Sequence, residues 1–593
     1  MKILALYLGH CTTVAYMDQG NLVDCVSEEK FDNIKNSMRF PIHSIEWIMK
    51  KNNLSLDSFD KIAIVGTSTV FYDLHDSDVL SIAEGEKEER FIKKIYRFVD
   101  TAWQSEYKDR LIANMQLARY RKYYPTRKEL FLRQLGDRLG IDIGKTEQVK
   151  FVDHHDCHAY SAYYGLRQED RSDALVFTLD GQGDFSCARV YTVRQGKWEK
   201  AADTWWKYSI GELYSSLTRI LGMKSLEHEY KVMGLAAYSE EKYYEDTKRE
   251  IFDGLFWLED LEFRSRIPSY AFDNYLKERI AYHRFDNLAG AAQALLEELV
   301  LDWISKAIAQ TGIKNIYTGG GVFMNVKLNK RIQELSEVES VHFMPSAGDE
   351  STPIGAAYYI HKNYAEEPNS FDHIYLGPEY DDRSIEDFLN DQINDFDYEV
   401  EYFEEIEKKV AMLLSDSKIV GRFKGRCEWG ARSLGNRAIL GRPDRMETFF
   451  EVNDRIKQRD FWMPFAPTIL DQYADRYLSN PKNVKAPYMI TAFDATEEGM
   501  VKFKAAMHQR DKTLRAQILE RQFNPLYYKL IEYFYDMTGI GGVMNTSFNL
   551  HGYPLAATPE QAWFTFENSD LEYLALGNFL VRKRIVTRSD EKR

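Results

Sequence analysis

The chain has 593 residues, which is too long for a single hydrophobic core, so more than one domain is expected. Its 44% hydrophobic and 28% charged residues are typical of an ordinary globular protein and argue against a disordered or fibrous chain. The formal net charge of −15 disfavours a protein that binds nucleic acid through bulk electrostatics.

Cysteines and apolar segments indicate the compartment. The five cysteines are scattered and never form a CxxC pair, which argues against a disulfide framework and a thiolate zinc site. No stretch of about 18 apolar residues occurs, so no membrane span is expected. These features predict a cytoplasmic protein in a reducing environment.

Two hairpins with small or glycine-containing turns stand out along the chain. The segment KILALYLGHCTTVAYMDQGNLVDCVSEEK, at residues 2–30, predicts three strands separated by two turns. The segment DALVFTLDGQGDFSCARVYTV, at residues 173–193, predicts a strand, a glycine turn and a strand. Actin-like and sugar-kinase-like ATPases hold nucleotide phosphates with two such turns, because small residues let the backbone approach the anion. Either hairpin alone would be an ordinary structural element.

A helical insertion is predicted between the hairpins, at about residues 85–140. Its stretch ARYRKYYPTRK is rich in arginine and aromatic residues. A solvated insertion is the expected interpretation, and a substrate-facing lid is the alternative.

The motif VDHHDCHAYSAYYG, at residues 152–165, concentrates histidines and aspartates. Asp153 is a good N-cap, and the residues after it predict a helix that ends at Gly165. His154 and His158 are four residues apart, on one face of that helix, so both imidazoles can bind one metal ion, whereas His155 points elsewhere. Polar residues that only cap the helix and satisfy one another are the alternative.

A metal ion needs a further ligand, and the candidate is Asp349 in GDESTPIGAA, on a loop ahead of a predicted helix. Two histidines and a carboxylate suit iron(II) or another divalent ion. A zincin motif is excluded, because His228 and Glu229 begin HExxH but Val232 stands at its last position.

A third glycine element, IYTGGGVFMNVKLN at residues 316–329, follows a long predicted helix. A strand, three glycines and a helix predict a further nucleotide contact, because N–H groups are exposed where a helix begins. The residues expected to contact the nucleotide here are Gly319, Gly320, Gly321 and Asn325.

The composition changes near residue 370. A polar stretch with prolines at about residues 365–382 predicts a linker, and basic segments follow it. We therefore expect one domain at residues 1–370, which contains the insertion, and a second at residues 371–593.

The order of the motifs carries a resemblance. HHDCHAYSAYY, EYKVMGLAAY, GGGVFMNVKLN, GDESTPIGAA, GRCEWGARSLGNRAIL, RDFWMPFAP and NTSFNLHGYPLAATPEQA resemble the ordered motifs of the O-carbamoyltransferases, the nodulation-factor, cephamycin, nebramycin and novobiocin carbamoylation enzymes. The match runs from LGHCTTVAY near the start to LALGNFLV near the end. It favours the metal-site interpretation, with His154, His158 and Asp349 as ligands.

This resemblance implies an α/β and α+β protein with two coupled sites. An N-terminal actin-like (ASKHA) ATPase-type domain would be followed by a C-terminal YrdC-like domain, similar to the threonylcarbamoyl-adenylate synthase fold. The C-terminal domain would form carbamoyl adenylate from carbamoyl phosphate and ATP, with Mg²⁺. The N-terminal domain would hold that adenylate at the metal and pass the carbamoyl group to a hydroxyl.

Phosphate-rich substrates require fixed cations with fork geometry. In the C-terminal half such cations stand among glycine, tryptophan and apolar residues, and two polar residues add neutral hydrogen bonds. The predicted set is Arg432, Arg437, Lys457, Arg459, Arg515, Asn545 and Ser547. Family members commonly carry an arginine just before PFAP, where this chain has Met463, so one expected cation is missing and Arg459 is the neighbour that could replace it.

Transfer to an alcohol requires a base and stabilisation of the developing oxyanion. His10, at the first turn, is the candidate base or carbamoyl contact, with a structural histidine as the alternative. Lys231 in EYKVMG is the candidate partner of a phosphate or carbonyl oxygen. The turn that contains Asp180, Gly181 and Gly183 is expected to hold the nucleotide.

The acceptor is open at this stage. A small natural-product alcohol is expected, and a hydroxymethyl pyrimidine in DNA is the alternative, for which ARYRKYYPTRK offers phosphate and stacking contacts. The oligomeric state is also open, with a homodimer among the alternatives. Two other classes compete: an actin-like small-molecule kinase, which leaves the arginine-rich half unused, and a non-catalytic nucleotide-gated binding subunit.

Overall fold

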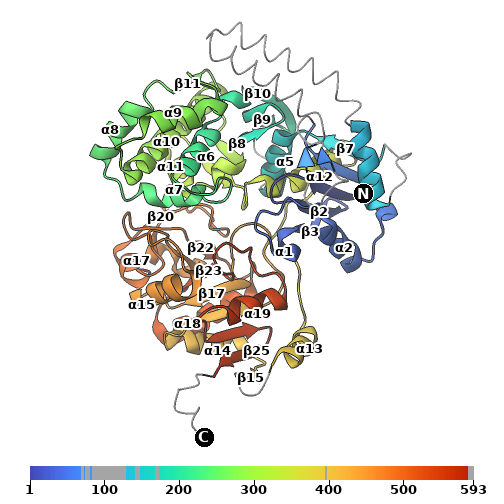
Figure 1. Cartoon of the computed structure of the whole chain (residues 1–593), viewed down its shortest axis with the longest axis vertical. Coiled ribbons are helices and arrows are strands. Elements are labelled where there is room, and N and C mark those ends of the chain that lie inside the picture. The colour runs from blue at the N-terminus through green and yellow to red at the C-terminus, as the bar shows by residue number, and fades with distance from the viewer. Residues whose placement is uncertain are drawn as a thin grey trace.

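The computed structural model describes residues 1–67, 72–73, 81–82, 128–140, 147–166, 173–393 and 397–584. Three large sheets organise these residues, two in the N-terminal part and one in the C-terminal part (Figure 1). Within the described ranges, no helix is long and apolar enough to cross a membrane.

The first sheet has five strands in the order β3-β2-β1-β4-β7. The first three form an antiparallel meander, and the other two are added in parallel. The turn between β2 and β3 places Gln19 and Gly20 at φ of 47° and 80°, as a type I′ hairpin requires. The strands are β1 Lys2–Tyr7, β2 Thr13–Asp18, β3 Asn21–Ser27, β4 Lys61–Val65 and β7 Val149–Val152.

The second sheet repeats this order and these directions, as β10-β9-β8-β13-β14. Two successive sheets of this topology form the predicted actin-like architecture. The pairing of β8 with β9 is interrupted between Leu179 and Gly183, so the residues between them leave the ladder. The strands are β8 Ala174–Gly183, β9 Ser186–Arg194, β10 Lys197–Trp205, β13 Asn315–Gly319 and β14 Ser340–Phe343.

Two helices lie between these sheets. α12 (Thr352–Tyr364) packs on β1 and β4, α5 (His154–Leu166) packs on β8 and β13, and the two helices pack against each other (Figure 1). Their approach requires a glycine, because a Cβ at Gly355 would lie 1.7 Å from the carbonyl oxygen of Cys157. The other helices of this part are α1 Glu29–Asp32, α2 Ile42–Lys51, α6 Ile210–Ile220, α7 Glu229–Ala236, α8 Glu241–Ile251, α9 Phe272–Arg279, α10 Phe285–Thr311 and α11 Val326–Glu334.

The C-terminal part is built on a mixed eight-stranded sheet in the order β15-β25-β24-β16-β17-β23-β18-β22. This part has its own buried core, and its helices and strands make it α/β as well. Its similarity to a YrdC-like domain stays a prediction. The strands are β15 Tyr398–Tyr402, β16 Val420–Phe423, β17 Arg437–Gly441, β18 Ala466–Leu470, β22 Gln517–Leu519, β23 Gly542–Ser547, β24 Tyr573–Leu576 and β25 Phe579–Lys583. The helices are α13 Asp382–Gln392, α14 Ile406–Ser415, α15 Met446–Phe450, α16 Ala474–Tyr477, α17 Glu497–Lys502, α18 Pro525–Thr538 and α19 Pro559–Glu567.

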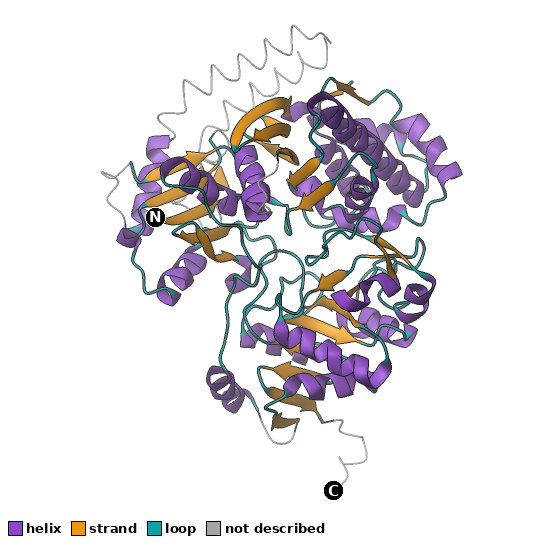
Figure 2. Cartoon of the chain, turned by 180° about the vertical axis from the view of Figure 1, so that it is seen from behind, coloured by secondary structure: helices purple, strands orange, loops and turns teal. Residues whose placement is uncertain are grey.

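The predicted linker lies between α12 and α13 and has no regular structure. It is nevertheless packed, since Ile374 and Leu376 are buried in the N-terminal core. Seen from behind, loops of both parts meet at the centre of the molecule (Figure 2). Most of the predicted insertion lies outside the described residues; residues 128–139 are helical.

Candidate metal centre and anion site

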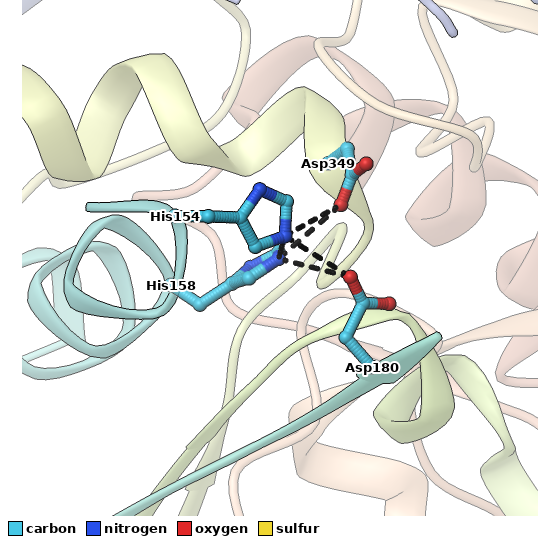
Figure 3. A group of neighbouring side chains, drawn as sticks. All are labelled: His154, His158, Asp180 and Asp349. Atoms are coloured by element: carbon cyan, nitrogen blue, oxygen red, sulfur yellow. Dashed lines mark hydrogen bonds and ion pairs between the residues drawn. The ribbon is translucent and has the colours of Figure 1, made fainter. Parts of the chain in front are cut away.

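Four side chains from three elements converge at one point in the N-terminal part (Figure 3). His154 and His158 come from α5, Asp180 from the irregular stretch of β8, and Asp349 from the 3-10 turn that precedes α12. One donor atom of each residue lies within 4.8 Å of the other three. We call these four residues the metal quartet. It contains the three predicted ligands and adds Asp180, which the sequence suggested as a nucleotide contact.

The first turn of helix α5, which carries His154, is capped by the side chain of Asp153. The carboxylate of Asp153 accepts the backbone N–H of His155 at 2.9 Å and that of Asp156 at 3.1 Å, which is the predicted capping. The helix continues through Gly165 to Leu166, the last described residue of this range, so Gly165 does not end it as predicted. Gly165 instead permits close packing, because a Cβ there would lie 2.3 Å from the ring of Phe371.

Most of the donor separations fit a single ion. The Nε2 atoms of His154 and His158 are 3.1 Å apart, and Asp180 Oδ2 lies 3.1 Å from the first and 3.6 Å from the second. Asp349 Oδ1 lies 3.4 Å and 3.3 Å from the same two nitrogens. Ligands about 2.1 Å from an ion, at angles of about 90–109°, are separated by roughly 3.0–3.4 Å. Two imidazoles and two carboxylates therefore suit a divalent transition metal ion.

The outer atoms of the quartet are held by neighbours, so the inner atoms face one another. The Tyr7 hydroxyl donates to Asp349 Oδ2, and Ser351 Oγ lies 3.3 Å from His158 Nδ1. The backbone N–H of Gly321 donates to Asp180 Oδ1 at 3.0 Å. Partners of this kind fix the orientation of metal ligands.

The electrostatics of the quartet are mutually compensated. Burial alone would lower the pKa of His154, but the carboxylates of Asp349 and Asp180 raise it well above its usual value. Burial alone would raise the pKa of Asp349, but His154 and His10 hold it well below its usual value. Two carboxylates balanced by positive charge are the arrangement that a bound divalent cation would also satisfy.

His10 lies beside the quartet, as its predicted role requires. Its Nδ1 atom is 3.6 Å from Asp349 Oδ2 and 3.4 Å from the Tyr7 hydroxyl. About a third of its side chain is exposed (32%), and it lines the cavity described below. It is therefore accessible to a substrate next to the metal quartet.

The predicted nucleotide glycines divide into two groups. Gly181, Gly183 and Gly321 line the cavity, together with Asn325 and Asp180. Gly319 and Gly320 do not: a Cβ at Gly319 would lie 2.6 Å from the carbonyl oxygen of His158, and one at Gly320 would lie 2.4 Å from that of Leu179. These two glycines let β13 approach α5 and β8, so their role here is close packing.

Four cations of the C-terminal part form a second cluster. Arg432, Lys457, Arg459 and Arg515 all line the cavity, and none of them forms an ion pair with a carboxylate of the described residues. We call them the cation cluster. Arg432 Nε, Arg459 Nε and Arg515 Nη1 are closed off from solvent without a hydrogen-bond partner in the described part of the chain. Burial, Arg432 and Arg459 together hold the pKa of Arg515 well below its usual value. An anionic ligand would stabilise such a cluster.

Neutral groups flank these cations as predicted. Lys457 Nζ donates to the carbonyl oxygens of Ser547 and Asn549, both at 2.8 Å. Asn545 and Ser547 line the cavity. Met463 also lines it, where an arginine was expected, and the Arg459 guanidinium lies within 3.4 Å of the carbonyl oxygen of Met463.

Two of the predicted cations, Arg437 and Lys231, do not line the cavity. The Arg437 guanidinium donates to the carbonyl oxygens of Lys424 and Pro378, both at 3.1 Å, and lies 3.6 Å from the centre of the Phe423 ring. Arg437 therefore stabilises the backbone at Lys424 and Pro378 rather than facing a ligand. Lys231 turns toward the C-terminal part, where its Nζ atom is 2.9 Å from Asp460 Oδ2.

One cavity of about 1030 Å³ reaches both groups. It is lined by His154, Asp180 and Asp349 of the quartet and by the whole cation cluster. The loop of Arg432 lies against the loop of Asp349, because the N–H of Ala431 donates to Ser346 Oγ at 3.3 Å. Sequence reasoning missed two further side chains of this region, Tyr7 and Tyr230, which carry no motif that would distinguish them from core tyrosines.

Comparison with known proteins places the chain among carbamoyltransferases. The family model for the carbamoyltransferase N-terminus matches residues 2–358, and that for the C-terminus matches residues 411–583. The chain is 25% identical to nodulation protein NolNO of Sinorhizobium fredii over 98% of this chain and 80% of that protein. It is 29% identical to nodulation protein NolO of Bradyrhizobium diazoefficiens over 74% of this chain and 80% of that protein.

A more distant likeness is found to a solved structure, full-length HypF in its phosphate- and nucleotide-bound form. The identity is 13%, the TM-score is 0.32, and the alignment covers 62% of this chain and 47% of HypF. The family models are far more specific. Because the N-terminal one alone spans more than half of the residues, this chain belongs to the carbamoyltransferase family and is a carbamoyltransferase.

Proposed function

We propose that the protein is an ATP-dependent O-carbamoyltransferase that carries out two half-reactions in one cavity. The observation that carries this proposal is that three residues of the metal quartet and the whole cation cluster line the same space. In the first half-reaction, carbamoyl phosphate, ATP and water give carbamoyl adenylate, phosphate and pyrophosphate. In the second, an alcohol oxygen bonds to the carbamoyl carbon, AMP leaves, and the hydroxyl proton passes to a base.

The cation cluster suits the first half-reaction. Carbamoyl phosphate and ATP carry several phosphate groups, and the departing pyrophosphate gains charge in the transition state. Arg432, Arg459 and Arg515 line the cavity, each with one guanidinium nitrogen that has no hydrogen-bond partner among the described residues, and guanidinium forks match phosphate oxygens. Asn545 and Ser547 add neutral hydrogen bonds at the same wall. Mg²⁺ is expected to accompany ATP.

The metal quartet suits the second half-reaction. A divalent ion held by these four residues would supply positive charge beside the carbamoyl carbonyl or the leaving AMP phosphate; iron(II) is our expectation, from the two imidazoles and two carboxylates. His10 lines the cavity next to the quartet, which supports a role as the base that takes the hydroxyl proton at a ring nitrogen. Gly181, Gly183 and Gly321 leave room for the adenylate close to the backbone.

The acceptor that we propose is a small molecule with a free hydroxyl group, as the family resemblance implies. The DNA alternative depends on the stretch ARYRKYYPTRK, whose residues 118–127 lie outside the described part of the chain. Incubation of candidate alcohols with enzyme, ATP and carbamoyl phosphate should add one carbamoyl group, detected by mass spectrometry. Pyrophosphate release that does not depend on carbamoyl phosphate would refute the proposal.

A further inference from the structure

Helix α7 belongs to the N-terminal part but is fastened to the C-terminal segment that carries two cations. Tyr230, Met233 and Gly234 of this helix line the cavity. Between them Lys231, only 8% exposed, turns away from the cavity and pairs with Asp460 at 2.9 Å. Asp460 directly follows Arg459 of the cation cluster.

Two more contacts strengthen this junction. The indole Nε1–H of Trp462 donates to the carbonyl oxygen of Lys231 at 3.2 Å. His508 Nε2 lies 3.0 Å from the carbonyl oxygen of Gly234, and His508 is itself buried (4% exposed). One short helix thus contacts Asp460 and Trp462, which follow Arg459, and His508 of a separate C-terminal segment.

That loop has no regular secondary structure around Arg459. The π-helix Glu451–Lys457 ends just before it, and Gln458 adopts a left-handed conformation with φ of 49°. The Arg459 guanidinium makes only two long hydrogen bonds, each 3.4 Å, to the carbonyl oxygens of Met463 and Pro464. The Phe465 ring lies 4.2 Å from the guanidinium, and the Asn453 side-chain amide donates to the backbone carbonyl oxygen of Arg459 at 3.2 Å. The position of Arg459 therefore depends on how its neighbours are held.

We propose that α7 is a clamp for the first half-reaction, in which Lys231 holds Asp460 and thereby positions Arg459 toward the phosphates of carbamoyl phosphate and ATP. Lys231 is then a positioning residue and not the direct phosphate or carbonyl contact that the sequence suggested. The clamp rests on the proposed function, and it makes the chemistry of the C-terminal part depend on a helix of the N-terminal part.

The full-length chain tests the clamp with Lys231→Met, Asp460→Asn and the double variant. In an assay of pyrophosphate release, each single variant should raise the KM for carbamoyl phosphate about tenfold, a loss of ground-state binding. The double variant should be no worse than either single one, because both remove the same contact. Transfer from supplied carbamoyl adenylate should stay within about twofold of wild type, and Lys231→Arg, which keeps the cation, should retain most of the affinity.

A matched control is Asp494→Asn, which breaks the 3.0 Å pair with Lys330 between the same two parts, away from the cavity lining. It should leave the KM for carbamoyl phosphate unchanged. An unchanged KM in Lys231→Met would overturn the clamp, as would an equal loss of transfer from supplied adenylate, which would make Lys231 a contact of the transfer site. Arg515→Ala distinguishes a failure of the clamp from a failure of the proposed function. If this variant also releases pyrophosphate normally, the proposed function itself fails.

Discussion

The metal quartet and the cation cluster lie at one cavity but differ in charge balance. The charges of the quartet compensate one another, whereas the cations of the cluster form no ion pair with a carboxylate in the described chain. In the quartet, His154 and His158 lie within 3.6 Å of the carboxylate oxygens of Asp180 and Asp349, so charge is balanced inside the group. In the cluster, Arg459 and Arg515 have no carboxylate partner in the described chain. Burial lowers the pKa of Arg459 to about 10.

This difference indicates how each site is completed. The quartet is pre-organised, because Tyr7, Ser351 and the Gly321 N–H already fix its outer atoms. The cluster is destabilised until an anion arrives, because buried charges without partners cost free energy. We therefore expect a cation to bind the first site with little rearrangement and an anion to stabilise the second site measurably.

Removal of a quartet ligand should affect metal binding and carbamoyl transfer but not the first half-reaction. Asp349→Ala should lose bound metal and reduce carbamoyl transfer by more than about 100-fold, while pyrophosphate release stays near wild type. Elemental analysis and mass spectrometry of the acceptor measure both. Asp156→Asn is a matched control, because Asp156 lies on the same helix but bonds the Tyr191 hydroxyl at 2.6 Å. Unchanged metal content and transfer in Asp349→Ala would show that the quartet is not the metal site.

Arg515→Ala should impair the first half-reaction but not carbamoyl transfer. Loss of a desolvated phosphate contact costs about 2–5 kcal/mol, so pyrophosphate release should fall by roughly 30-fold or more. Transfer from supplied carbamoyl adenylate should persist. The control is Arg510→Ala, which removes a nearby arginine that pairs with Glu240 at 3.3 Å, with both side chains about half exposed. Near-normal release in the Arg515 variant would place activation elsewhere.

The uncompensated charge of the cluster should also be visible in stability. Arg515→Met removes a cation but keeps much of its volume, so the unliganded protein should gain on the order of 1 kcal/mol, roughly 2–4 °C in the Tm of the C-terminal transition. Added pyrophosphate should raise the Tm of wild type but have little effect on this variant. A lower Tm in Arg515→Met would contradict the idea of an unbalanced cation.

The smallest effect concerns His551, which lines the cavity. Burial, Lys231 and Lys35 lower the pKa of His551 from 6.5 to about 4. The unfolded chain therefore binds more protons between these values, and the free energy of unfolding should fall as the pH drops from 6.5 to about 4. In His551→Asn that fall should be smaller, as measured by urea denaturation at each pH. An identical pH profile would mean that His551 titrates normally.

Much of the fold could be predicted because its signals are local. Apolar strands joined by turns at Gly20 and Asp184 are enough to predict the paired hairpins from the sequence alone. A glycine is typical of a helix terminator, but Gly165 lies inside α5 and makes room for Phe371, which lies 206 residues further along the chain. Contacts at that sequence separation leave no local pattern.

For the site residues, too, only local sequence signals could be predicted. The spacing of His154 and His158 predicts a shared ligand, because helical geometry alone brings them together. The position of Asp180 beside them depends on an irregularity in β8, which the sequence does not reveal. Arg437 shows the limit of composition: an arginine among apolar residues can bind phosphate, but here it bonds backbone carbonyls.

The most direct test of a shared cavity is complementation between two inactive variants. Asp349→Ala retains the cation cluster, and Arg515→Ala retains the metal quartet. If both half-reactions use one cavity, an equimolar mixture should carbamoylate the acceptor at less than about one-tenth of the wild-type rate, because the adenylate would have to cross solvent between chains. A mixture that approaches half of the wild-type rate would contradict the shared cavity and show that carbamoyl adenylate is released between the two steps.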